Sequence, residues 1–205
     1  MKLATPFSTL ACAGLAALVP GLASPAPLQL TQIYGPAAVK PERLPSIQWI
    51  ENGNAYTTLE ASSAPGGGKD VVRNDTATGV RTLLVRAALL TPAGAPKPLD
   101  AGDHEWSPDG RVLLLKIDAD GARRNNPIGD YWLFDTQTRS LRRVGLERPP
   151  GTSLYAQFSP DGSRIAYVSA NNLYVERVEP VGGGAAQQLT SDGNDVLLNG
   201  RGDLV

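Results

Sequence analysis

Cysteine and histidine are almost absent from this sequence, and their scarcity excludes several kinds of site. The 205 residues include one Cys and one His. A disulfide framework needs paired cysteines, and a zinc cluster needs several Cys or His ligands. We therefore expect a protein with neither, and with no metal site or other cofactor.

Charge is also scarce and nearly balanced. Only 19% of the residues are charged, with 19 Lys and Arg against 20 Asp and Glu. Without a basic run, the chain lacks the positive surface that nucleic acid requires, so nucleic acid is not an expected partner. What the sequence does contain is 22 Gly, 17 Pro and 41% hydrophobic residues, which suits one or two domains with buried cores.

The N-terminal segment has the pattern of a secretory signal. Lys2 is followed by residues 3–23 without a charge, and the segment ends on the small residue Ala23. We expect a signal peptide over 1–23 that is cleaved after Ala23. A lipoprotein signal with lipidation at Cys12 is the alternative. The mature chain would have no transmembrane span and would be exported to the periplasm or the cell exterior.

A repeated pentapeptide is the strongest internal pattern. Trp106–Gly110 reads Trp-Ser-Pro-Asp-Gly, and Phe158–Gly162, about 50 residues later, reads Phe-Ser-Pro-Asp-Gly; residues 49–53 form a degenerate third copy. Pro presets φ at the first corner of a turn, Asp bonds the following backbone, and Gly adopts the left-handed conformation that ends the turn. The predicted structural turn residues are Trp106, Pro108, Asp109, Gly110, Phe158, Pro160, Asp161 and Gly162.

Short strand-like segments between these turns indicate the architecture. Four strands in each repeat of about 50 residues are typical of a β-propeller blade. We expect an all-β partial propeller of about three blades at approximately 46–103, 104–155 and 156–190, with 191–205 starting a fourth. A β-sandwich is the alternative, and one helical turn is expected over 86–90. The aromatic residues expected to pack between blades are Trp49, Trp106, Trp132, Phe158 and Tyr167.

An ordered series of motifs resembles the N-terminal propeller of dipeptidyl peptidase IV, a serine exopeptidase of the prolyl oligopeptidase superfamily. The series is LLTPAG at 89–94, NNPIGDYWLF at 125–134, FSPDG at 158–162 and NNLYV at 171–175, and it ends with LTSDG at 189–193. In that family, the segment resembling Asn199–Arg201 leads to a pair of glutamates that hold the substrate's amino terminus. Here residues 202–205 read Gly-Asp-Leu-Val. The resemblance therefore implies a chain truncated before the Glu-Glu motif and the catalytic domain.

Catalytic residues cannot be assembled from the sequence. An α/β-hydrolase needs a Gly-x-Ser-x-Gly elbow with a His and an acid. The nearest string, Gly151–Tyr155, lacks the last Gly, and we expect it to be a loop. His104, the single histidine, is expected to be a strand residue bonded by a neighbour. No catalytic residue is assigned.

Two functions remain after these exclusions. One is a non-catalytic propeller portion of a dipeptidyl-peptidase-IV-like enzyme, in which the resemblance implies that the propeller controls substrate access. Its partners would be the downstream propeller and hydrolase portion, or other copies of itself. The alternative is a stand-alone secreted propeller module that binds a periplasmic protein.

Overall fold

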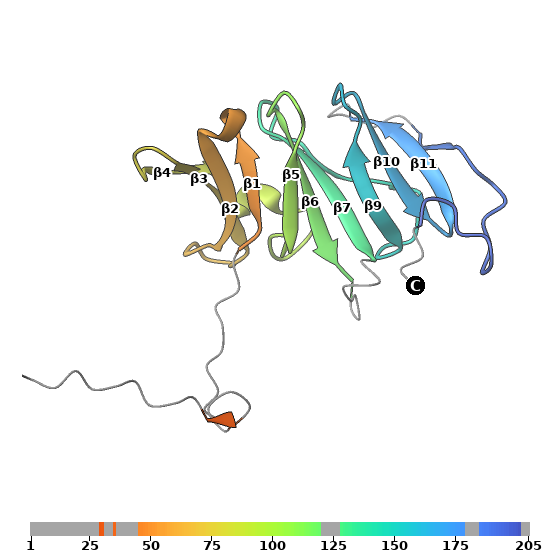
Figure 1. Cartoon of the computed structure of the whole chain (residues 1–205), viewed down its shortest axis with the longest axis horizontal. Coiled ribbons are helices and arrows are strands. Elements are labelled where there is room, and N and C mark those ends of the chain that lie inside the picture. Colours follow the sequence, from red (N-terminus) through yellow and green to blue (C-terminus); the bar gives the residue numbers. More distant parts are fainter. Residues whose placement is uncertain (1–28, 31–34, 36–44, 120–127, 179–184, 202–205) are drawn as a thin grey trace, which may run out of the picture. The chain divides into compact units, whose positions relative to one another are not determined.

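The computed structural model describes residues 29–30, 35, 45–119, 128–178 and 185–201 (Figure 1). The expected signal peptide, its cleavage point at Ala23 and the alternative lipidation site at Cys12 lie outside these residues. All of the strands belong to a unit that spans Leu44–Val205. In the described ranges, no helix is long and apolar enough to cross a membrane.

Strands dominate this unit, and its only helices within the described ranges are two short 3₁₀ turns, η1 (Glu51–Gly53) and η2 (Ala87–Leu90). The second of these corresponds to the helical turn expected over 86–90. The strands are β1 (Ile47–Ile50), β2 (Ala55–Ala61), β3 (Lys69–Asp75), β4 (Arg81–Val85), β5 (Asp103–Trp106), β6 (Val112–Asp118), β7 (Gly129–Asp135), β8 (Leu141–Arg143), β9 (Ser153–Phe158), β10 (Arg164–Ser169), β11 (Asn172–Arg177) and β12 (Gln187–Gln188).

The strands form three antiparallel meanders. The first meander, β1 to β4, is a separate four-stranded sheet. The second, β5 to β8, and the third, β9 to β12, share an eight-stranded sheet and are linked by the pairing of Gly129 with Ser153. A side chain at Gly129 would lie 2.2 Å from the carbonyl oxygen of Ile117, so this junction requires glycine. The all-β class expected from the sequence is confirmed.

The second meander is buried on both faces. Successive side chains of a strand point to opposite faces, and all four residues Val112–Leu115 of β6 are buried. Val112 and Leu114 pack toward the third meander, whereas Leu113 and Leu115 pack toward the first. The first set also contains Tyr131, Leu133, Ile165, Tyr167 and Tyr174. The second also contains Leu59, Val71, Val85 and Phe134. These two clusters hold successive meanders face to face.

Two expectations need correction. Trp49 does not pack in a core: its side chain is 65% exposed and meets Tyr56 edge-on at a ring distance of 5.5 Å. The string Gly151–Tyr155 is not simply a loop, because β9 begins at Ser153 and pairs with β10. The expected blade boundary between 155 and 156 therefore falls inside a strand.

Candidate functional site

Both Ser-Pro-Asp-Gly turns have the same hydrogen-bond pattern. Asp109 Oδ1 accepts hydrogen bonds from Ser107 Oγ at 2.6 Å and from the Arg111 amide at 3.1 Å. In the second copy, Asp161 Oδ1 accepts bonds from Ser159 Oγ at 2.5 Å and from the Ser163 amide at 3.0 Å. The bond from Ser159 is the main cause that lowers the pKa of Asp161, to about 2. Each carboxylate therefore stays ionised and closes its turn.

The two turns also touch each other. Gly110 and Gly162 have φ values of +69° and +70°, in the region that glycine alone adopts without strain. A Cβ at Gly162 would lie 3.1 Å from Cδ of Pro108, whereas a Cβ at Gly110 would have no heavy atom within 4 Å. The turn of the third meander is thus seated against the turn of the second.

A hydrogen-bond cluster centred on Thr57 links the first meander to the second. The Nε1–H group of Trp106 donates to Thr57 Oγ1 at 3.0 Å, and His104 Nε2 lies 2.8 Å from the same oxygen. His104 is only 2% exposed. The sequence predicts a bonded strand histidine but does not identify Thr57 as its partner, since nothing in a single sequence pairs residues so far apart.

The imidazole of His104 is neutral in the folded protein. Burial lowers its pKa to about 4, although the charge of Asp103 opposes this shift. The Thr57 hydroxyl already accepts from Trp106, so it can donate its own proton to a neutral His104 Nε2. The ring proton is then on Nδ1, which has no hydrogen-bond partner.

A groove of about 750 Å³ lies where the β1–β2 turn approaches the β5–β6 turn. Glu51 and Asn52 in this groove have positive φ values of 53° and 54°. Non-glycine residues in this conformation cost about 1–3 kcal/mol each and are concentrated at functional sites. The other lining residues include Trp49, Arg73, Leu84, Trp106 and Pro108.

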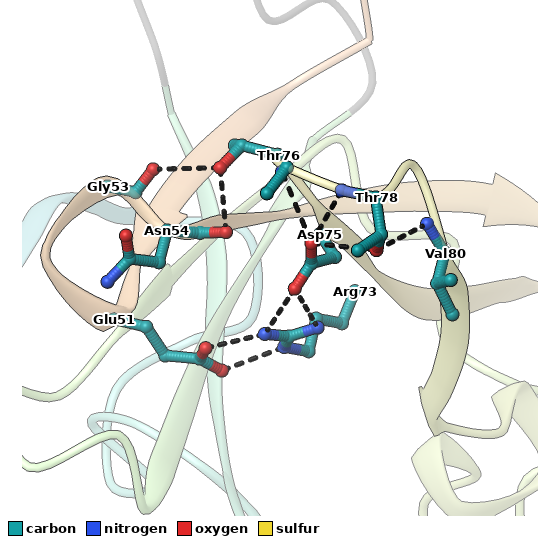
Figure 2. Close-up of polar contacts among 9 residues, drawn as sticks. Glu51, Gly53, Asn54, Arg73, Asp75, Thr76, Thr78 and Val80 are labelled. Carbon is teal, nitrogen blue, oxygen red and sulfur yellow. Dashed lines mark hydrogen bonds and ion pairs between the residues drawn. The ribbon is translucent and has the colours of Figure 1, made fainter.

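Ionic contacts hold this strained turn in place (Figure 2). Arg73 donates to both oxygens of Glu51, at 2.7 Å from Nε and 2.5 Å from Nη2. It also lies 3.4 Å from Asp75 Oδ2. The hydrogen bond from Arg73 lowers the pKa of Glu51. Asp75 Oδ1 in turn accepts bonds from the amide and the hydroxyl of Thr78, so Arg73 and its two acidic partners are bonded within the first meander.

A second groove, of about 490 Å³, crosses the first strands of all three meanders. Glu105 is half-buried there, and burial, assisted by the charge of Asp103, raises the pKa of its carboxyl. Lys116 also lines this groove and forms an ion pair with Asp118 at 2.9 Å. The remaining lining residues are Gln48, Asp103, His104, Leu114, Tyr131, Tyr155, Ala156 and Gln157.

The structure places the remaining candidates apart. Ser153 is a buried residue at the start of β9, while the hydrogen bond of the His104 ring goes to Thr57. Within the ranges that the structure describes, no group of three or more His, Cys, Asp or Glu side chains could hold a metal ion. The lining of both grooves includes aromatic and carboxylate side chains.

Known proteins are similar to this chain in fold and, over part of its length, in sequence. The crystal structure of Porphyromonas gingivalis dipeptidyl peptidase 4 superposes with a TM-score of 0.64 at 20% identity, over 82% of this chain and 22% of that one. The fold is therefore a partial β-propeller. Residues 107–205 match the family model of the dipeptidyl peptidase IV (DPP IV) N-terminal region. Residues 107–205 are therefore similar to the N-terminal region of DPP IV.

Relatives from fungi agree with this assignment. A "Probable dipeptidyl-aminopeptidase B" from Talaromyces stipitatus is 26% identical over 168 residues, which cover 78% of this chain. The "Dipeptidyl aminopeptidase B" of Saccharomyces cerevisiae is 30% identical over 99 residues, or 48% of this chain. The matched parts are 18% and 11% of those proteins, so the chain spans less than a fifth of either relative.

The contact between the two repeat turns predicts unequal effects of the same substitution. Gly110→Ala should lower the free energy of unfolding by about 1–2 kcal/mol because alanine is strained at positive φ. Gly162→Ala should cost more, since it has the same strain and its Cβ also crowds Pro108. Urea denaturation at one protein concentration measures both variants. Equal losses of unfolding free energy in the two variants would show that the contact between the turns does not contribute to stability.

The buried imidazole predicts a loss of stability in mild acid. The unfolded chain takes up a proton on His104 near pH 6.5, whereas the folded protein does so only near pH 4. The contribution of neutral His104 to the free energy of unfolding is therefore fully present above about pH 6.5. It falls by about 3 kcal/mol as the pH drops to about 4. The pKa of Glu105 is raised, so the titration of this carboxyl increases the free energy of unfolding as the pH falls.

Substitution of the histidine isolates its contribution. His104→Gln removes the imidazole and leaves Glu105 in place, so the difference in unfolding free energy between the two proteins reports His104 alone. We expect this difference to change between pH 7 and pH 4 and to be constant above pH 7. Parallel pH profiles for the two proteins would contradict a neutral buried imidazole.

Proposed function

We propose that this chain is the non-catalytic N-terminal propeller portion of a DPP-IV-like serine peptidase that acts on peptides. The match of residues 107–205 to the DPP IV N-terminal region is the observation that carries the proposal. In this role the propeller would control the access of substrates to a hydrolase site contributed by residues outside this chain. The uncharged segment 3–23 supports export, with cleavage after Ala23 and a periplasmic or extracellular location.

The absence of catalysis is supported by the surroundings of the single histidine. His104 is buried, neutral and bonded to Thr57, so it has no contact with a serine nucleophile in the described residues. A general base must lie within hydrogen-bond reach of the group that it deprotonates. The chain would thus contribute a wall of the substrate chamber and no reacting group.

A stand-alone module that binds a periplasmic protein is the second candidate. It is favoured by apolar side chains of the first meander that are exposed to solvent. Trp49 is 65% exposed, Leu83 44% and Ile47 38%. Aromatic and aliphatic residues grouped in this way are frequent at protein interfaces.

Activity assays test whether the chain is catalytic. The purified chain should not hydrolyse Gly-Pro or Ala-Pro chromogenic amides, because no triad can be assembled from its residues. The His104→Ala variant is the control. Turnover that persists in this variant would identify a contaminating peptidase, whereas turnover that the substitution abolishes would contradict the proposal.

The state of association separates the two candidates. If the first meander normally packs against a further blade, its exposed face should drive self-association, since burying apolar surface is worth about 25 cal/mol per Å². Size-exclusion chromatography with light scattering should then show oligomers, and Trp49→Ser should shift them toward the monomer. A monodisperse monomer with a cooperative thermal transition would favour the stand-alone module.

A further inference from the structure

Half of the residues that line a small cavity beside the second Ser-Pro-Asp-Gly turn are arginines. The volume of this cavity is about 290 Å³, which is sufficient for one tetrahedral anion with a few waters. Three of the six lining residues are arginines, and none of the six is acidic. The lining residues are Arg111, Gly162, Ser163, Arg164, Arg177 and Val178.

Arg111 is held in place from one side only. Its Nε lies 3.4 Å from Oδ2 of Asp135, a residue that is 2% exposed. The other oxygen of Asp135 accepts the amides of Gln137 and Thr138, which fixes the carboxylate. Within the described residues, the two Nη groups of Arg111 make no hydrogen bond, so this anchored guanidinium keeps donors available.

Arg164 adds a second charge that its own sheet does not balance. In the register of β10 and β11 it stands directly opposite Arg177, and like charges at opposed positions destabilise a sheet. No carboxylate in the described part of the chain lies within ion-pair distance of Arg164. A bound anion would therefore give Arg164 a charge partner.

The neighbouring carboxylates already have partners. Glu176, next to Arg177, accepts bonds from Arg142 Nη1 at 2.5 Å and from the Gly145 amide at 3.1 Å. Asp161 is bonded by Ser159 and Ser163 within its own turn. Both carboxylates are therefore already bonded, and neither forms an ion pair with Arg111 or Arg164.

The backbone around the cavity is also fixed before any ligand binds. The Val178 amide donates to the carbonyl of Ser163 at 3.1 Å, and the Gly162 amide donates to the carbonyl of Ser159 at 2.8 Å. Residues 162–164 and 177–178, which supply five of the six lining residues, are thus tied to each other or to the turn. A preorganised site loses less entropy on binding than a flexible one.

We propose that this cavity binds a phosphate group, with Arg111 and Arg164 as the principal donors. The planar guanidinium fork matches the oxygens of a phosphate. The phosphate can belong to a soluble compound or to a lipid headgroup, and the chemistry of the site is the same in both cases. The proposal does not depend on peptidase activity.

Calorimetric titration of the full chain with inorganic phosphate, against sodium chloride at equal ionic strength, tests the site. Saturable binding of phosphate is expected. Arg164→Gln should weaken it about tenfold or more, since a hydrogen bond to a charged group contributes about 1.5–3 kcal/mol. Arg164→Lys should retain part of it, because the charge remains and the fork is lost.

A matched substitution outside the cavity controls for net charge. Arg86 is exposed beside η2, and Arg86→Gln should leave the phosphate affinity unchanged. Circular dichroism checks that each variant keeps its strands. The proposal is overturned if phosphate does not saturate, if Arg164→Gln binds as the unmodified chain does, or if Arg86→Gln weakens binding equally.

Vesicle sedimentation then distinguishes the two sources of phosphate. Vesicles of phosphatidylglycerol are compared with vesicles of phosphatidylcholine, for the chain and for Arg164→Gln. The site would be assigned to a lipid headgroup if the chain binds the anionic vesicles, if free phosphate displaces it from them, and if Arg164→Gln does not bind them. Calorimetric binding of phosphate without such sedimentation would assign it to a soluble phosphorylated compound.

Discussion

The burial of both faces of the β6–β7 hairpin is the constraint on which the rest of the structure depends. Val112 and Leu114 face the third meander, while Leu113 and Leu115 face the first. Each fully buried aliphatic side chain contributes about 1.5–3 kcal/mol, so these faces fix the neighbouring meanders. The Thr57 cluster and the contact between Gly162 and Pro108 can form only once that packing has brought the meanders together.

The local elements could be predicted from the sequence because their causes are local. A Pro-Asp-Gly string determines its own turn, and alternating apolar residues determine which side chains share a face. The exposure of Trp49 could not be predicted in this way, since period-two alternation does not say which face is covered. The start of β9 at Ser153 was also missed, because Gly151 and Thr152 resemble a linker and the strand is defined by its pairing with β10.

The grooves and the arginine cavity were harder to predict because residues from different meanders form them. Glu51 has a positive φ, and the bonds that retain it come from Arg73, on a different strand. Arg111 and Arg164 belong to separate repeats and meet only through the docking of two turns. A single sequence shows each of these charges, but the docking of the meanders decides whether a charge is neutralised, as at Arg73, or left with donors available, as at Arg111.

The Thr57 cluster makes the docking of the first two meanders sensitive to protons. Trp106 Nε1 can only donate, so the Thr57 oxygen must accept from it, and the hydroxyl proton can pass to His104 Nε2 only while that nitrogen is unprotonated. Protonation would turn Nε2 into a donor and leave the hydroxyl proton with the carbonyl of Gln48, 3.5 Å away. A charge on this buried ring would then weaken the contact between the first two meanders, whose residues line the 750 Å³ groove. The cluster therefore links the shape of that groove to the protonation of a single imidazole.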